Sequence, residues 1–500
     1  MKVIVLLFLS FCTIAQTKTD LVLAKKIKEF DAYVIKAQKE WEVPGLSVAI
    51  VKDGQVIFIK GYGVRALGKT DAVNAQTLFA CASTTKAMTA TCMGMLVDEG
   101  KISWDDEVQK YLPEFQLYDP YVTREIKIRD LFIHDTGLGN TDFLWGIMDI
   151  SSEEILNKMR WVKPTYSLRS SFIYQNIFYL AAGKVIEKVS GMPWDQYITE
   201  RIFKPLNMTR TVSLAKFNKD VNTTMPHFKI EGKTTVIEHS NADPVGPAGS
   251  VLSNAEDISK WMLCMLDSSK YAGGRLVSGE TWTEMFKPQM LVPAEQFYPT
   301  MQLTKPNWTT YGLGWFQHDY KGHKVNFHTG SLDGAIAIHA QLPDERLGIY
   351  VFGNMDHAEM RHALVYKAFD HFALGGMRDW STEFLKLYSN IMLDGEKKIN
   401  EFEAKRVLNT KTSQPIENYL GKYADPLYGE VEITAHGDRL TFNINNDLKA
   451  TFDHWHYDTF RGWYDKKWHG KGNAIFILNE EGKISKVNFD GIEFIKKVNP

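Results

Sequence analysis

The chain has 500 residues, of which 44% are hydrophobic and 24% are charged. This composition is typical of globular proteins, and the length suffices for two or three domains. Basic residues number 58 and acidic residues 60, giving a net charge of −2. Such a balance excludes the strongly basic character of nucleic-acid-binding and anionic-membrane-binding proteins, so we expect no nucleic acid partner.

The first residues have the features of a secretion signal. Lys2 precedes an apolar run over residues 3–12, and Ala15 is a small residue suited to cleavage. Because the run is too short to span a bilayer, we expect no transmembrane anchor. The sequence therefore predicts a signal peptide over residues 1–15 and an exported protein, either periplasmic or secreted.

Only three cysteines follow this segment, Cys81, Cys92 and Cys264. Three thiols cannot form a disulfide framework, and none of them has the spacing of a metal-ligand set. Their surroundings are apolar, which favours buried free thiols. We predict no metal and no cofactor.

The chain before residue 80 predicts a helix and then the start of a sheet. Apolar and charged residues alternate over 23–41 in the manner of an amphipathic helix. Two β-rich runs, 46–52 and 55–63, flank a Lys-Asp-Gly turn, which is a hairpin signal.

Ser83 and Lys86 open an apolar stretch that extends to residue 97 and predicts a buried helix. A spacing of three places the hydroxyl and the amine on one helix face. A lysine that is desolvated among apolar neighbours can have a lowered pKa and remove the serine proton. The tetrapeptide alone also fits a serine cap followed by a solvated lysine.

Polar residues at two downstream junctions are further candidates. His134 and Asp135 follow a short helix predicted within 126–139, and we expect a structural loop role for them, since adjacent residues form a poor catalytic relay. Tyr174 and Asn176 lie where a loop meets an apolar helix, a position from which side chains can face a cleft.

The middle of the chain predicts a loop, a helix and a run of strands. Residues 244–251 are rich in glycine and proline, which predicts a tight loop, and polar caps at 253–257 introduce a helix. Residues 324–354 indicate a strand, then a glycine break, then a β-hairpin.

Composition changes near the C-terminus. A charged helix is predicted over 384–407, and short alternating runs from residue 416 onward indicate a small antiparallel β domain, either a sandwich or a barrel. His454, His456 and His469 in this part lack a carboxylate or cysteine at ligand spacing, so we interpret them as half-exposed strand residues.

Three short motifs follow one another along the chain, namely Ser83-x-x-Lys86, Tyr174-x-Asn176 and His328-Thr329-Gly330. In this order they resemble the serine β-lactamase and penicillin-binding protein family. The similarity is to the class C type, which includes D-Ala-D-Ala carboxypeptidases, D-amino-acid peptidases and esterases, and it covers about residues 24–374. The last domain resembles the lipocalin-like module attached to some family members.

The resemblance implies an α+β fold in which an antiparallel sheet is flanked by helices and a helical subdomain, with a small all-β domain after it. The expected divisions are a signal peptide (1–15), a serine hydrolase domain (24–375), a helical connector (376–414) and a lipocalin-like β domain (415–500).

The resemblance also implies roles for the motif residues. Ser83 would be the acylated nucleophile, with Lys86 and Tyr174 as its proton-handling partners and their shares of the base role left open. Asn176 would bind substrate and Lys86. The remaining expected residues are the substrate-binding His328, Thr329 and Gly330, and the oxyanion-hole N–H groups of Ser83 and Ser331.

One residue departs from the pattern. Many β-lactamases carry a lysine where this chain has His328, and a fixed cation there helps to hold a substrate carboxylate. Because histidine is mostly neutral at pH 7, the change lowers the expectation of β-lactamase activity more than that of acyl transfer.

The resulting hypothesis is an exported serine hydrolase that cleaves an amide or ester through an acyl-Ser83 intermediate. We expect its substrate to be a D-residue-containing peptide or a cell-wall fragment. The alternatives are an esterase or β-lactamase with the same mechanism, and a non-catalytic sensor of penicillin or peptidoglycan. Sequence leaves the oligomeric state open.

Overall fold

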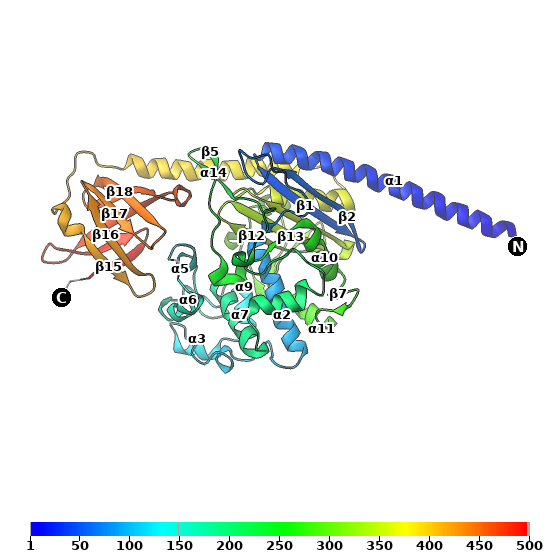
Figure 1. The fold of residues 1–500 in the computed structure, drawn as a ribbon, viewed down its shortest axis with the longest axis horizontal. Coiled ribbons are helices and arrows are strands. Elements are labelled where there is room, and N and C mark those ends of the chain that lie inside the picture. The colour runs from blue at the N-terminus through cyan, green and yellow to red at the C-terminus, as the bar shows by residue number, and fades with distance from the viewer. Residues whose placement is uncertain (1, 149, 498–500) are drawn as a thin grey trace.

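A large body of helices and sheet is joined to a small barrel by a long helix (Figure 1). This computed structural model describes residues 2–148 and 150–497, with side chains from residue 21 onward. The predicted signal peptide, residues 1–15, therefore lies outside the residues with described side chains. Its backbone from Lys2 belongs to helix α1 (Lys2–Glu40), whose second half contains the helix predicted over 23–41. No helix in the described ranges has both the length and the apolar character needed to cross a bilayer.

The large body is built on a sheet of eight antiparallel strands in the order β2-β1-β14-β13-β12-β11-β10-β9. The first strand of this sheet in the sequence, β1, pairs with the last, β14, along its length, with Val48 opposite Val351. The predicted hairpin over 46–63 is confirmed as β1 and β2. The strands are β1 (Gly45–Lys52), β2 (Gln55–Gly63), β9 (Met290–Leu291), β10 (Thr309–Tyr311), β11 (Phe316–Tyr320), β12 (His323–Leu332), β13 (Ala335–Leu342) and β14 (Leu347–Gly353).

Helix α2 lies at the centre of the helical part, against α7, α9 and α11. It is buried from Thr85 to Leu96, which confirms the predicted buried helix. Helices α10 and α13 pack on the sheet, α10 against β1 and β14 and α13 against β13 and β14. The α-helices of this body after α1 are α2 (Thr85–Asp98), α3 (Pro120–Glu125), α4 (Asp130–Ile133), α5 (Phe143–Gly146), α6 (Ser152–Lys158), α7 (Ile177–Ser190), α8 (Trp194–Ile198), α9 (Gly246–Gly249), α10 (Ala255–Leu266), α11 (Gly279–Met285), α12 (Met301–Thr304) and α13 (Met360–Phe369).

One local expectation differs from the structure, because the predicted loop over 244–251 contains the short helix α9, which packs against α2 and α7. The strand, glycine break and β-hairpin predicted over 324–354 are confirmed as β12, a turn at Asp333 and Gly334, and the paired strands β13 and β14. Three short two-stranded sheets complete the body, and their strands are β3 (Phe79–Ala80) with β6 (Leu252–Ser253), β4 (His227–Ile230) with β5 (Lys233–Val236), and β7 (Lys270–Tyr271) with β8 (Gly274–Arg275).

The C-terminal domain is a closed barrel, which decides between the two predicted β architectures. Helix α14 (Trp380–Ala404) leads to it, and β22 pairs back with β15 to close it. Buried phenylalanines such as Phe442, Phe452 and Phe489 fill its interior. The strands are β15 (Gly421–Asp425), β16 (Gly429–His436), β17 (Arg439–Asn443), β18 (Lys449–His456), β19 (Thr459–Tyr464), β20 (Lys471–Leu478), β21 (Ile484–Phe489) and β22 (Ile492–Lys496).

Candidate active site

Ser83 lies in a tight turn directly before α2. The turn, Ala82–Thr84, is a 3₁₀ helix, and Ala82 enters it with φ of 46°, a left-handed conformation that is uncommon outside glycine. From residue 81 to residue 96, Ser83 is the one residue that is not buried. Local strain of this kind is found where a side chain must be held in a defined place, and here it presents a single hydroxyl at the surface of a buried segment.

The Lys86 amine is fully buried and contacts three oxygen atoms. Its Nζ lies 3.0 Å from Ser83 Oγ, 2.7 Å from Asn176 Oδ1 and 2.9 Å from the Ala248 carbonyl oxygen. A neutral amine has two N–H groups and one lone pair. With both N–H groups directed to Asn176 and Ala248, which can only accept at these atoms, the lone pair is free to accept the Ser83 proton.

Burial lowers the pKa of Lys86 to about 7, because the ammonium form loses its hydration. The negative charge of Asp142 acts in the opposite direction and is the smaller effect. The amine also lies 5.1 Å from the ring centres of both Tyr174 and Tyr179. Near neutral pH a substantial fraction of this lysine is therefore the free base.

Tyr174 lies beside the same pair. Burial raises its pKa well above the usual 10, while a hydrogen bond with Ser83 acts weakly against that shift. The His134 ring packs on the Tyr174 ring with centroids 4.2 Å apart, and His134 Nδ1 accepts the Gln175 N–H at 3.1 Å. His134 thus contacts the site through Tyr174, in keeping with the structural role expected for it.

A carboxylate that the sequence analysis missed orients Asn176. Asn176 Nδ2 donates to both oxygens of Asp142, at 2.9 and 3.0 Å, which leaves its Oδ1 for Lys86. The Trp145 indole N–H and the Asn140 amide also donate to this carboxylate, at 2.8 and 2.9 Å. Asp142 lies in a polar loop 34 residues before Asn176, and nothing in the local pattern distinguished it.

Strand β12 passes close to the Ser83 backbone at Gly330. A methyl group on Gly330 would lie 2.2 Å from the Cys81 carbonyl oxygen and 3.1 Å from the Ser83 nitrogen, so only glycine allows this approach. The next residue, Ser331, lines the cavity in front of Ser83. The two segments expected to supply oxyanion-hole N–H groups therefore lie side by side.

A buried arginine, also missed from sequence, supports that stretch of β12. Arg361 Nη1 donates to the Gly330 carbonyl oxygen at 2.5 Å and to Ser331 Oγ at 3.0 Å, and Glu359 pairs with the same guanidinium at 2.9 Å. Because the pair is buried, its hydrogen bonds are strong and fix the β12 backbone beside Ser83.

His328 and Thr329 lie on β12 and are buried, with the His328 ring 6.3 Å from the Tyr174 ring. His328 Nδ1 donates to the Thr329 carbonyl oxygen at 2.6 Å, and its Nε2 accepts the Tyr311 hydroxyl at 2.9 Å. Burial and the nearby Lys86 lower the pKa of His328 to about 3, so the ring is neutral. Thr329 Oγ1 is hydrogen-bonded to Tyr298 at 2.5 Å. Neither residue lines the cavity.

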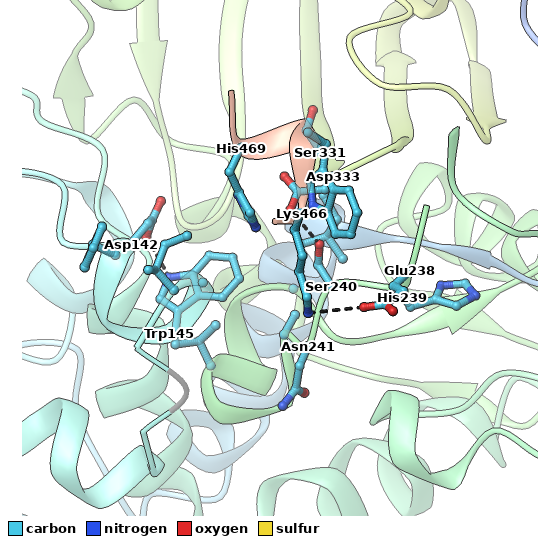
Figure 2. A pocket seen from close by; sticks show the side chains of 18 of the residues that line it. Asp142, Trp145, Glu238, His239, Ser240, Asn241, Ser331, Asp333, Lys466 and His469 are labelled. Carbon is cyan, nitrogen blue, oxygen red and sulfur yellow. Dashed lines mark hydrogen bonds and ion pairs between the residues drawn. The ribbon is translucent and has the colours of Figure 1, made fainter. Parts of the chain in front are cut away.

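A cavity of about 600 Å³ opens in front of Ser83. Its walls are formed by Asp142 and helix α5, by residues 238–242, by the end of β12 and by the barrel (Figure 2). The volume suits a small molecule or a short peptide segment. Among the described residues, no group of three or more histidine, cysteine or acidic side chains is arranged to hold a metal ion. The described cysteines Cys81, Cys92 and Cys264 are buried and free, as predicted.

Comparison with known proteins gives a consistent result. The Beta-lactamase family model matches residues 30–370, and a domain of unknown function (DUF3471) matches residues 405–498. The unguisins hydrolase of Aspergillus violaceofuscus is 24% identical over 478 residues, which cover 86% of this chain and 82% of that protein. Protein flp of Staphylococcus aureus (strain MRSA252) is 25% identical over 341 residues, covering 66% and 63%.

Solved structures share the fold. The octameric penicillin-binding protein homologue from Pyrococcus abyssi has a TM-score of 0.62 at 21% identity and covers 94% of this chain and 100% of its own. A D-stereospecific amidohydrolase from Streptomyces sp. has a TM-score of 0.54 at 23% identity and covers 65% and 94%. Since the family model spans more than half of the sequence, the chain belongs to the β-lactamase family of serine hydrolases.

Proposed function

We propose that this protein is an exported hydrolase that cleaves an amide or ester bond through an acyl-Ser83 intermediate. The observation that carries the proposal is the Lys86 amine, buried, 3.0 Å from Ser83 Oγ and with a pKa lowered to about 7. A neutral amine in this position is the base that a serine hydroxyl requires to become a nucleophile.

The pKa values of Lys86 and Tyr174 suggest different proton-transfer roles for the two residues. Ser83 Oγ attacks the carbonyl carbon while its proton moves to Lys86 Nζ, and the N–H groups of Ser83 and Ser331 stabilise the oxyanion. Tyr174, whose raised pKa keeps it protonated, gives its proton to the departing amine or alcohol and is reprotonated from Lys86. Water then attacks the ester, and the proton transfers run in reverse to release the acid and restore Ser83.

The proposed substrate is a peptide with a D-residue, or a related cell-wall fragment. One similar structure has a name that supports this class, the D-stereospecific amidohydrolase, and the unguisins hydrolase supports hydrolysis in general. The neutral, buried His328 supplies no cation for a substrate carboxylate. This favours amides and esters that do not depend on a carboxylate over β-lactam recognition.

The test is covalent labelling followed by turnover. A fluorophosphonate is expected to add to wild-type protein at Ser83, as mapped by peptide mass spectrometry, and to leave Ser83→Ala unlabelled. D-aminoacyl amides, D-Ala-D-Ala peptides, short acyl esters and a chromogenic cephalosporin then identify the substrate class. No adduct on folded wild-type protein would refute the mechanism, and stoichiometric acylation without turnover would instead indicate a sensor.

Export is part of the proposal and has its own test. The basic start and apolar run of residues 2–12 support it. Expression in a Gram-negative host is expected to give a periplasmic or secreted protein with a new N-terminus after about residue 15. A cytoplasmic product that retains Met1 would contradict it.

A further inference from the structure

The C-terminal barrel forms part of the cavity that contains Ser83. Its contribution comes from two segments, one at residues 445–448 and one at residues 466–469. Lys466, Trp468 and His469 line the cavity together with Ser83 and Asn176. A substrate bound to Ser83 therefore lies between the hydrolase body and the barrel.

The first attachment joins the barrel to α5, directly after Asp142. Asn445 donates its amide N–H to the Ile147 carbonyl oxygen, and the rings of Phe143 and Tyr428 pack edge to face with centroids 5.3 Å apart. Met148 is buried in the hydrophobic core of the barrel. The contacts are apolar and hydrogen-bonded, so the barrel is held against the wall of the cavity.

The second attachment is a pair of ion pairs across the boundary. Lys466 Nζ lies 3.1 Å from Glu238 of the hydrolase body and also contacts Asp447 within the barrel. Lys467 lies 3.4 Å from Glu231. The Lys466 side chain is only 21% exposed, and Figure 2 shows it extending from the barrel toward Glu238. Glu238 is 71% exposed, so solvent weakens this ion pair, which supplements the first attachment.

Trp468 is positioned by its neighbours on the same segment. The Lys466 amine lies 5.9 Å from its ring centre and the His469 ring lies 5.5 Å away. His469 in turn lies near Asp333 at the end of β12, whose charge raises the pKa of the imidazole against the larger effect of burial. A broad, half-buried indole is thus held in the wall of the cavity.

We propose that the barrel edge at residues 466–469 is the outer wall of the substrate site, and that Trp468 limits the size of the group the substrate places there. The inference rests on the proposed function, because it takes Ser83 as the reacting residue. A group larger than the space between α5 and this edge collides with the indole, so the barrel selects compact substrates.

The test compares two fluorophosphonates that differ only in size, one with a methyl and one with a branched, bulky alkyl group. The measured quantity is the ratio of their second-order rate constants for Ser83 labelling, bulky over small. Trp468→Ala is expected to raise this ratio about tenfold, the scale of a steric limit in a pocket, and Trp468→Phe to raise it less. Trp463→Ala is the matched control, since Trp463 packs with Lys467 and Lys471 and does not line the cavity.

The attachment gives a second readout that leaves the indole in place. Lys466→Met and Glu238→Gln each release the ion pair, so each is expected to raise the ratio, and the double variant to add little to either single change. A ratio that stays at the wild-type value in Trp468→Ala, with Ser83 still labelled and thermal unfolding still cooperative, would overturn the inference. If wild-type Ser83 is not labelled by either fluorophosphonate, the proposed function is refuted, and this inference with it.

Discussion

The Lys86 pKa makes a quantitative prediction about the pH dependence of acylation. Burial lowers this pKa from the ordinary 10.5 to about 7, and only the free amine can accept the Ser83 proton. The acylation rate is therefore expected to rise tenfold per pH unit below pH 7 and to level off above it, so that pH 5 gives about one hundredth of the plateau. With an unshifted pKa, roughly one lysine in 3,000 would be neutral at pH 7.

The assay is the rate of Ser83 labelling by a small fluorophosphonate between pH 5 and 9.5. Labelling isolates the acylation step, because no substrate release or deacylation contributes to it. Lys86→Met is expected to lower the plateau by about 10²- to 10⁴-fold and to remove the inflection near pH 7. An inflection above pH 9, or a profile that Lys86→Met leaves unchanged, would refute the assignment of Lys86 as the base.

The same pKa shift predicts how stability depends on pH. Between pH 7 and 10.5 the unfolded chain keeps the Lys86 proton while the folded chain releases it, so the free energy of unfolding rises with pH across this window. The gain has an upper limit of roughly 5 kcal/mol, since one pKa unit corresponds to about 1.4 kcal/mol. Urea unfolding of wild type and Lys86→Met at several pH values measures the difference between them. A difference that stays constant from pH 7 to 10 would contradict the shift.

Three further predictions concern the residues around the nucleophile. Asp142→Asn removes a charge that raises the pKa of Lys86, so the inflection of the labelling profile is expected to move to lower pH; a move to higher pH would contradict the electrostatic assignment. Gly330→Ala drives a methyl group to 2.2 Å from a backbone oxygen, and we expect a loss of about 1–3 kcal/mol in unfolding free energy together with loss of labelling. The control is Gly395→Ala in helix α14, where an added methyl group would have no neighbouring atom within 4 Å. This variant is expected to be neutral or stabilising by up to about 1 kcal/mol. Because His328 stays neutral, an ester substrate with a free carboxylate and its methyl ester are expected to keep a constant ratio of kcat/KM from pH 5.5 to 8, whereas a ratio that rises on acidification would show a protonated His328 binding the carboxylate.

The parts of the fold and site that could be predicted from the sequence were those that depend on short-range patterns. The Ser83 and Lys86 spacing, the apolar run of α2, the hairpin over residues 46–63 and the alternating C-terminal strands depend on neighbours within a few residues. The order of the three motifs was enough to identify the family, and the family model matches the same region. The sequence left open whether Lys86 is solvated or desolvated, and the structure shows that it is buried.

Long-range contacts decided the rest. Asp142 acts on Lys86 through Asn176, and the Ala248 carbonyl reaches Lys86 across 162 residues, so neither contact leaves a local signal. The need for glycine at position 330 also has a distant cause, because the chain at Cys81 passes too close for any side chain there. The orientation of His328 and the approach of the barrel to Ser83 likewise depend on which surfaces meet. The sequence alone thus determined which reactive groups this protein carries, and only its packing decided which of them face one another, because burial and distance set both their pKa values and their partners.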